Sequence, residues 1–210
     1  MNDKAFARNL RMPDGNIGKE LGKLMNSLNH NIIKYTYEQL KVSHEDKILE
    51  IGCGNALNAI QILANTSFDS YTGIDKSKAM VLEARNNLQD VFNSSKFEFL
   101  TGSVPNQLKL KKSYNKICSI NTLYFFQDLN ESFKSIWNVM DQGGNLCLAF
   151  RPKNQLQKSP FSKYYFNLYS TDEIVEELKN VGFYILDVCQ TQDESYNESL
   201  DIVCINALKQ

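Results

Sequence analysis

A glycine-containing turn after a short apolar segment is the part of the chain best suited to bind a ligand. Residues 48–56 read ILEIGCGNA, with Glu50 in the apolar segment and Gly52 and Gly54 in the turn. Glycine permits a tight turn and a close approach of the ligand to the backbone. The free N–H groups at a helix start attract polar or anionic groups. Leu57 stands where dinucleotide-binding loops carry a third glycine, which disfavours a bound pyrophosphate.

An acidic residue ends the next apolar segment and is placed to bind a second part of the same ligand. Asp75 closes the run YTGID over residues 71–75. A carboxylate at the end of the second strand can accept hydrogen bonds from the 2′- and 3′-hydroxyl groups of a ribose. The alternative is an acid that stabilises the helix beginning near Ser77. The order of Glu50, the glycine turn and Asp75 favours the ribose interpretation.

These residues need a sheet to position them, and the hydrophobic pattern predicts one. Strands that alternate with helices form a parallel sheet covered on both faces. The last two predicted strands have only a polar stretch between them and should pair antiparallel. We therefore expect an α/β, Rossmann-like three-layer sandwich whose seven-stranded, mostly parallel sheet has an antiparallel last strand. The predicted strands span 47–51, 70–74, 96–100, 114–120, 145–150, 184–191 and 200–208, and the predicted helices span 55–65, 77–92, 128–140 and 171–180.

The remaining N-terminal residues form a predicted helical arm. Residues 17–41 carry an apolar stripe at intervals of three and four residues, which is typical of a helix with at most one break. Residues 1–16 are polar and contain a turn signal at 12–15. We expect an N-terminal helical arm or lid over residues 1–44 and one domain over residues 45–210. The alternative for the arm is an amphipathic helix that simply packs on the sheet.

Composition and charge argue against several function classes. The 23 Lys and Arg residues nearly balance the 24 Asp and Glu residues, so bulk charge does not favour nucleic-acid binding. No apolar run is long enough to span a bilayer, and the N-terminus lacks the apolar core of a secretory signal. The five cysteines have no metal-binding spacing and predict reduced core residues in the cytoplasm, with no metal site.

The glycine turn and the second acid together resemble the motifs of the class I S-adenosylmethionine-dependent methyltransferases. The resemblance extends over about residues 45–210. It implies S-adenosylmethionine as the cofactor, with Gly52 and Gly54 along its methionine part, Asp75 at the ribose and Lys76 along the adenine. Ser103 stands where the family often has Asp or Asn. The implied cofactor-binding residues are Glu50, Gly52, Cys53, Gly54, Asp75, Lys76, Ser103, Val104 and Asn121.

The resemblance also implies a reaction that needs few titratable side chains, because the cofactor supplies the reactive group. Transfer of a methyl group to a small-molecule acceptor then depends mainly on alignment. Asn121 and Tyr124, after the fourth predicted strand, are the candidate catalytic residues. Asp128 is a candidate base or, alternatively, the N-cap of the next helix. Arg151 and Tyr124 are candidate acceptor-binding residues, since an aromatic-rich loop follows Arg151.

Two other function classes share these features. A nicotinamide-dependent oxidoreductase would use the same glycine turn and ribose acid, and a cofactor-binding protein without catalysis would carry the same motifs. If the arm covers the cofactor, Arg11 or Tyr35 would meet the methionine carboxylate. For the whole protein we expect a cytoplasmic monomer or homodimer, with no nucleic-acid partner and no stable membrane insertion.

Overall fold

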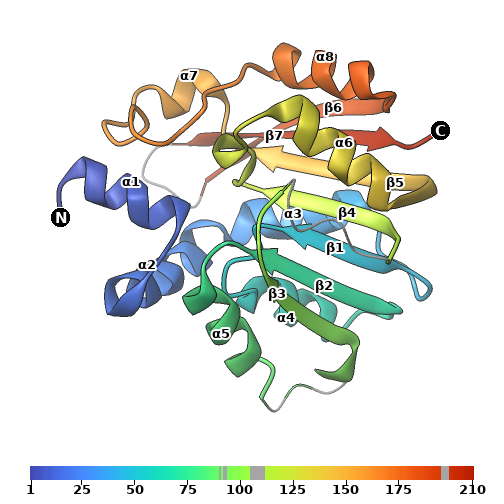
Figure 1. Ribbon diagram of the computed structural model, residues 1–210, viewed down its shortest axis with the longest axis horizontal. Coiled ribbons are helices and arrows are strands. Elements are labelled where there is room, and N and C mark those ends of the chain that lie inside the picture. Colours follow the sequence, from blue (N-terminus) through green and yellow to red (C-terminus); the bar gives the residue numbers. More distant parts are fainter. Residues whose placement is uncertain (90, 92–93, 105–111, 195–198) are drawn as a thin grey trace.

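Seven strands form one sheet with the order β3-β2-β1-β4-β5-β7-β6 (Figure 1). The computed structural model describes residues 1–89, 91, 94–104, 112–194 and 199–210. Strand β7 pairs antiparallel with both β5 and β6, whereas the pairs among β1 to β5 are parallel. The predicted α/β sheet with an antiparallel last strand is confirmed. The strands are β1 (Lys47–Ile51), β2 (Ser70–Asp75), β3 (Phe97–Thr101), β4 (Tyr114–Ile120), β5 (Met140–Phe150), β6 (Tyr184–Asp193) and β7 (Leu200–Leu208).

Helices cover both faces of the sheet. On one face, α6 (Leu129–Val139) and α8 (Thr171–Val181) bury their apolar residues in a cluster shared with β1, β4, β5 and β7. On the other face, α3 (His30–Leu40), α4 (Leu57–Leu63) and α5 (Lys78–Asn86) contribute to a second cluster. Burial of these apolar stripes is the main force that holds the layers together. The result is the expected three-layer sandwich.

The arm consists of more helices than the sequence predicts. The helical stripe expected over residues 17–41 contains the one break that the sequence allowed for, at Asn29, where α2 (Gly15–Leu28) meets α3. A preceding helix, α1 (Asp3–Arg11), was not predicted, because the segment is short and mostly polar, with Phe6 and Leu10 as its only large apolar residues. Helices α1 and α2 lie beside the carboxyl ends of the parallel strands, whereas α3 packs on the sheet itself (Figure 1).

Several element boundaries differ from the predicted ones for local reasons. Helix α4 begins two residues late because Ala56 has a left-handed backbone, with φ of +52°. Strand β5 begins at Met140 and continues through Gly143 and Gly144, with a shift of register against β4. The loop expected after β5 contains a short helix. The short elements are the 3-10 turns η1 (Ser94–Lys96) and η2 (Leu123–Phe125) and the helix α7 (Lys153–Leu156).

Two further expectations can be compared with the described residues. All five cysteines are free, and all except Cys189 are buried. Within the described part of the chain, no helix has both the length and the apolar character needed to cross a membrane.

Candidate functional site

A cavity of about 790 Å³ opens at the carboxyl ends of β1, β2 and β4, beneath α1 and α2. Its volume is within the range of about 300–1,000 Å³ that is typical of small-ligand sites. The structure brings together in its wall the predicted cofactor-binding residues and the residues Asn121, Tyr124 and Arg151, but not Asp128 or Tyr35. The residues brought together are Glu50, Gly52, Cys53, Gly54, Asp75, Lys76, Ser103, Val104, Asn121, Tyr124 and Arg151. Their individual roles stay predictions.

The glycine turn has the shape that a bound ligand requires. Gly52 has a φ of +81°, and a Cβ atom built there would lie 2.1 Å from Oγ1 of Thr122, so no larger residue fits. The backbone N–H groups of Gly52 and Cys53 both donate to the carbonyl oxygen of Ile74. Gly54 has a φ of +56°, and no atom lies within 4 Å of its Cβ position. The turn is therefore packed on one side and open to the cavity at Gly54.

The Asp75 carboxylate is held by backbone hydrogen bonds from the glycine turn and from the start of α5. One oxygen accepts the Gly54 N–H at 2.8 Å and the other accepts the Ser77 N–H at 2.7 Å. A carboxylate has about four lone-pair positions, so two remain free for a pair of ligand hydroxyl groups. Burial raises the pKa of Asp75, and the two backbone N–H groups oppose this shift. The arrangement fits the predicted ribose contact.

Glu50 is buried beneath the turn, at the end of β1, and is 4 % exposed. Its Oε2 atom accepts hydrogen bonds from the hydroxyl groups of Tyr37 and Tyr71, each at 2.8 Å. Burial raises the pKa of Glu50, whereas the two tyrosine hydrogen bonds lower it. These tyrosines could not be found from the sequence, because Tyr37 belongs to α3 in the arm and Tyr71 to the interior of β2.

This burial predicts a pH effect on stability. Because the pKa of Glu50 is raised in the folded state from its ordinary 4.5, the folded protein binds more protons than the unfolded chain just above that pH. Stability should therefore fall as the pH rises from 4.5 through the raised pKa. Glu50→Gln keeps an oxygen acceptor for both tyrosines but cannot ionise. In urea unfolding measurements, the variant should gain stability relative to the wild type across that window.

Glu38, an exposed residue of α3, supplies the control for this experiment. Glu38→Gln should leave the pH dependence of the unfolding free energy unchanged. The explanation is contradicted if the unfolding free energies of Glu50→Gln and the wild type change with pH in the same way from pH 4 to pH 8, because burial of the Glu50 charge would then cost no stability.

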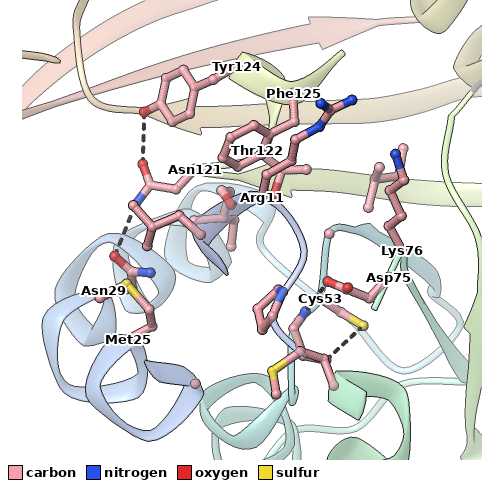
Figure 2. A pocket seen from close by; sticks show the side chains of 18 of the residues that line it. Arg11, Met25, Asn29, Cys53, Asp75, Lys76, Asn121, Thr122, Tyr124 and Phe125 are labelled. Carbon is pink, nitrogen blue, oxygen red and sulfur yellow. Dashed lines mark hydrogen bonds between the residues drawn. The ribbon is translucent and has the colours of Figure 1, made fainter. Parts of the chain in front are cut away.

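Asn121 and Tyr124 belong to a chain of hydrogen bonds at the end of β4. Asn121, with a φ of +49°, donates through Nδ2 to Oδ1 of Asn29 at 3.1 Å, and its Oδ1 accepts the Tyr124 hydroxyl at 3.0 Å (Figure 2). Tyr124 is 4 % exposed, and burial raises the pKa of its hydroxyl. The hydroxyl therefore stays protonated at neutral pH, which favours an orienting role toward Asn121 over a role as a base.

Arg151 lines the cavity, but its guanidinium group already has an anionic partner. Its Nη2 atom lies 2.5 Å from Oδ2 of Asp193, and both side chains are buried. Asn31 donates to the other oxygen of Asp193 at 2.9 Å. Asp193 could not be found from the sequence, because it lies at the end of β6, 42 residues from Arg151, which directly follows β5. Asp128, the other candidate base, caps α6 through the Glu131 N–H, as its alternative interpretation predicts.

The arm is tied to the domain at the edge of the cavity. The Ser77 hydroxyl, which caps α5, donates to the carbonyl oxygen of Pro13. Lys19 of α2 forms an ion pair with Glu83 of α5 at 3.0 Å. Arg11, at the end of α1, is half-buried and lines the cavity. Of the two arm residues proposed to meet a carboxylate, Arg11 is thus in the cavity wall, whereas the Tyr35 ring packs beneath the sheet.

Comparison with known proteins identifies the family behind this geometry. Residues 48–144 match the family model described as a methyltransferase domain. An uncharacterized methyltransferase YdaC of Bacillus subtilis is 24 % identical over 167 residues, covering 80 % of this chain and 87 % of the relative. A malonyl-[acyl-carrier protein] O-methyltransferase of Ilyobacter polytropus is 31 % identical over 147 residues, and these cover 66 % of this chain and 53 % of that relative.

A solved structure shares the fold over nearly the whole chain. Magnesium protoporphyrin IX methyltransferase from Synechocystis, with bound S-adenosylhomocysteine, matches with a TM-score of 0.67 at 15 % identity, over 98 % of this chain and 93 % of that one. The open Gly54, the remaining lone pairs of Asp75 and the cavity volume fit the same group here. Residues 48–144 therefore belong to the methyltransferase domain family, the chain has the fold of a solved methyltransferase, and its cavity fits S-adenosylmethionine as the cofactor.

Proposed function

We propose that this methyltransferase acts on a small-molecule acceptor bound in the same cavity as the cofactor. The observation that carries the proposal is the continuity of that cavity, which runs from the glycine turn and Asp75 to an apolar wall formed by α1, η2 and the loop after β5. Such a partly enclosed, mostly apolar cavity suits a small ligand. A long polymer such as a nucleic acid would need an open, basic surface instead.

When bound, S-adenosylmethionine supplies a methyl group on a positively charged sulfur, whose leaving group is a neutral thioether. In the proposed arrangement, Gly52 and Gly54 let the methionine part approach the backbone, and Asp75 accepts the ribose hydroxyl groups. Asn121 lies between Asn29 and Tyr124, which hold its amide in one orientation beside the acceptor space. The protein's contribution is then mainly alignment, which can lower a barrier by about 7–11 kcal/mol.

We propose further that α1 and α2 act as a lid over this cavity, within an arm that spans residues 1–44. Both helices line the cavity, and the arm meets α5 through the Ser77 to Pro13 hydrogen bond, the Lys19 to Glu83 ion pair and the close approach of Gly22 to Met80. Helix α3, the last part of the arm, packs against the sheet and through Tyr37 supports Glu50, so it anchors the arm to the domain over residues 45–210. The expected cytoplasmic location and the monomeric or dimeric state stay predictions.

The acceptor class can be tested without knowing the acceptor. The purified protein is incubated with S-adenosylmethionine labelled in its methyl group, and with a cell extract divided into a low-mass fraction, an RNA fraction and a protein fraction. We expect enzyme-dependent label in the low-mass fraction. Label that enters only RNA or protein would overturn the proposal of a small-molecule acceptor, and it would leave the methyltransferase assignment intact.

A further inference from the structure

Aromatic side chains from the arm and from the loop after β5 form one continuous wall of the cavity. Phe6 of α1 packs edge-on against Phe161, with ring centroids 5.2 Å apart. Phe161 contacts Phe166 at 5.7 Å, and Phe166 contacts Phe125 at 4.8 Å. All four rings line the cavity. The apolar part of a ligand would pack against these rings, since buried aromatic area favours apolar groups.

Arg11 is placed at this wall as a cation that has no anionic partner among the described residues. It lies over the ring of Tyr165, 5.8 Å from the ring centroid, and none of the ion pairs of the described residues includes it. Of the other charged residues in the cavity wall, Lys76 lies beside Asp75 on the cofactor side, and three are already engaged (Figure 2). Glu50 accepts two tyrosine hydroxyl groups, Asp75 accepts two backbone N–H groups, and Arg151 pairs with Asp193.

The direction of the Arg11 side chain separates it from the cofactor residues. Figure 2 shows its guanidinium group toward Phe125, away from Cys53 and Asp75. The contact with Tyr165 agrees with this view, because Tyr165 belongs to the loop after β5 and not to the glycine turn. A guanidinium group in a partly enclosed, aromatic setting binds carboxylate or phosphate oxygens in a bidentate manner.

We propose that the acceptor is a small molecule with an apolar body and one anionic group, and that Arg11 binds the anionic group while the aromatic wall binds the body. This inference rests on the proposed function and adds the chemical class of the acceptor. The same anion chemistry could come from the carboxylate of the cofactor, and the test therefore measures both ligands separately.

The test uses full-length protein saturated with S-adenosylhomocysteine and titrated with two matched pairs of probes in a calorimeter. The pairs are 4-phenylbutyrate with 4-phenylbutyramide, and octanoate with octanamide, which differ only in the anionic group. The wild type should bind each acid at least tenfold more tightly than its amide. Arg11→Gln should reduce that preference to less than twofold and leave the affinity for S-adenosylhomocysteine within twofold of the wild type.

Arg8→Gln is the matched control, because Arg8 lies on the same helix but is exposed and does not line the cavity. It should keep the full preference for the acids. Three results would overturn the inference: an acid preference that survives Arg11→Gln, no binding of either acid to the wild type, or a tenfold loss of S-adenosylhomocysteine affinity in Arg11→Gln with the acid preference kept. The last would assign Arg11 to the cofactor. None of the three excludes a small-molecule acceptor, which the labelling experiment tests independently.

Discussion

Replacing Asp75 with alanine is expected to weaken the binding of S-adenosylhomocysteine by at least tenfold. The proposed contacts are two hydrogen bonds from ribose hydroxyl groups to an ionised carboxylate, and each bond of this kind contributes about 1.5–3 kcal/mol. A loss of only about 1.4 kcal/mol already corresponds to a tenfold change in affinity. The substitution also removes the acceptor for the Gly54 and Ser77 N–H groups, which loosens the turn. Isothermal titration calorimetry measures the effect directly.

Asp128 provides a matched control for this substitution. Like Asp75, it accepts a backbone N–H group near a helix start, but it is exposed and does not line the cavity. Asp128→Ala should cost about 1 kcal/mol of folding stability through the lost cap and leave ligand affinity unchanged. If both variants bind S-adenosylhomocysteine as tightly as the wild type while remaining folded, Asp75 is not the ribose-binding residue.

The second large effect is expected at Asp193. Asp193→Ala removes the carboxylate that faces the buried Arg151 guanidinium group, and the loss of one member of a buried ion pair costs about 3–5 kcal/mol. For a chain of this length, that cost should lower the unfolding temperature by about 6–20 °C. Thermal unfolding followed by circular dichroism measures the shift, and urea unfolding gives the free energy.

Two further variants distinguish a charge effect from a general loss of packing. Adding Arg151→Met to Asp193→Ala removes the unpaired charge, so the double variant should regain most of the lost stability. Glu20→Gln breaks the exposed ion pair with Lys23 and should produce no measurable change, because exposed pairs are screened by water and salt. A double variant less stable than Asp193→Ala would contradict the account of an unpaired buried charge.

The fold could be predicted from the sequence because its signals are local. Each signal affects only the few residues next to it in the chain. Examples are the apolar runs, the helix caps Ser77, Asp128 and Ser170, and Gly182, which ends α8. Helix α1 was not predicted, since its sequence is mostly polar and its two large apolar residues, Phe6 and Leu10, line the cavity, where Phe6 contacts Phe161.

The candidate site could be predicted only in part, for a related reason. The glycine turn and Asp75 lie at strand ends whose positions follow from the order of elements, and the structure places them together. The partners that set the charge of the site come from distant segments: Tyr37 for Glu50, and Asp193 for Arg151. Such pairings depend on the tertiary fold and leave no local pattern in the sequence. For this reason Arg151 was expected to bind the acceptor, although Asp193 already compensates its charge.

The central claim is that S-adenosylmethionine binds across the glycine turn and Asp75. A crystal structure of the protein with S-adenosylhomocysteine tests it most directly. The account predicts both ribose hydroxyl groups within hydrogen-bond distance of the Asp75 carboxylate, and the amino-acid end of the ligand along Gly52 and Gly54. A ligand bound elsewhere, or a ribose that does not contact Asp75, would contradict it.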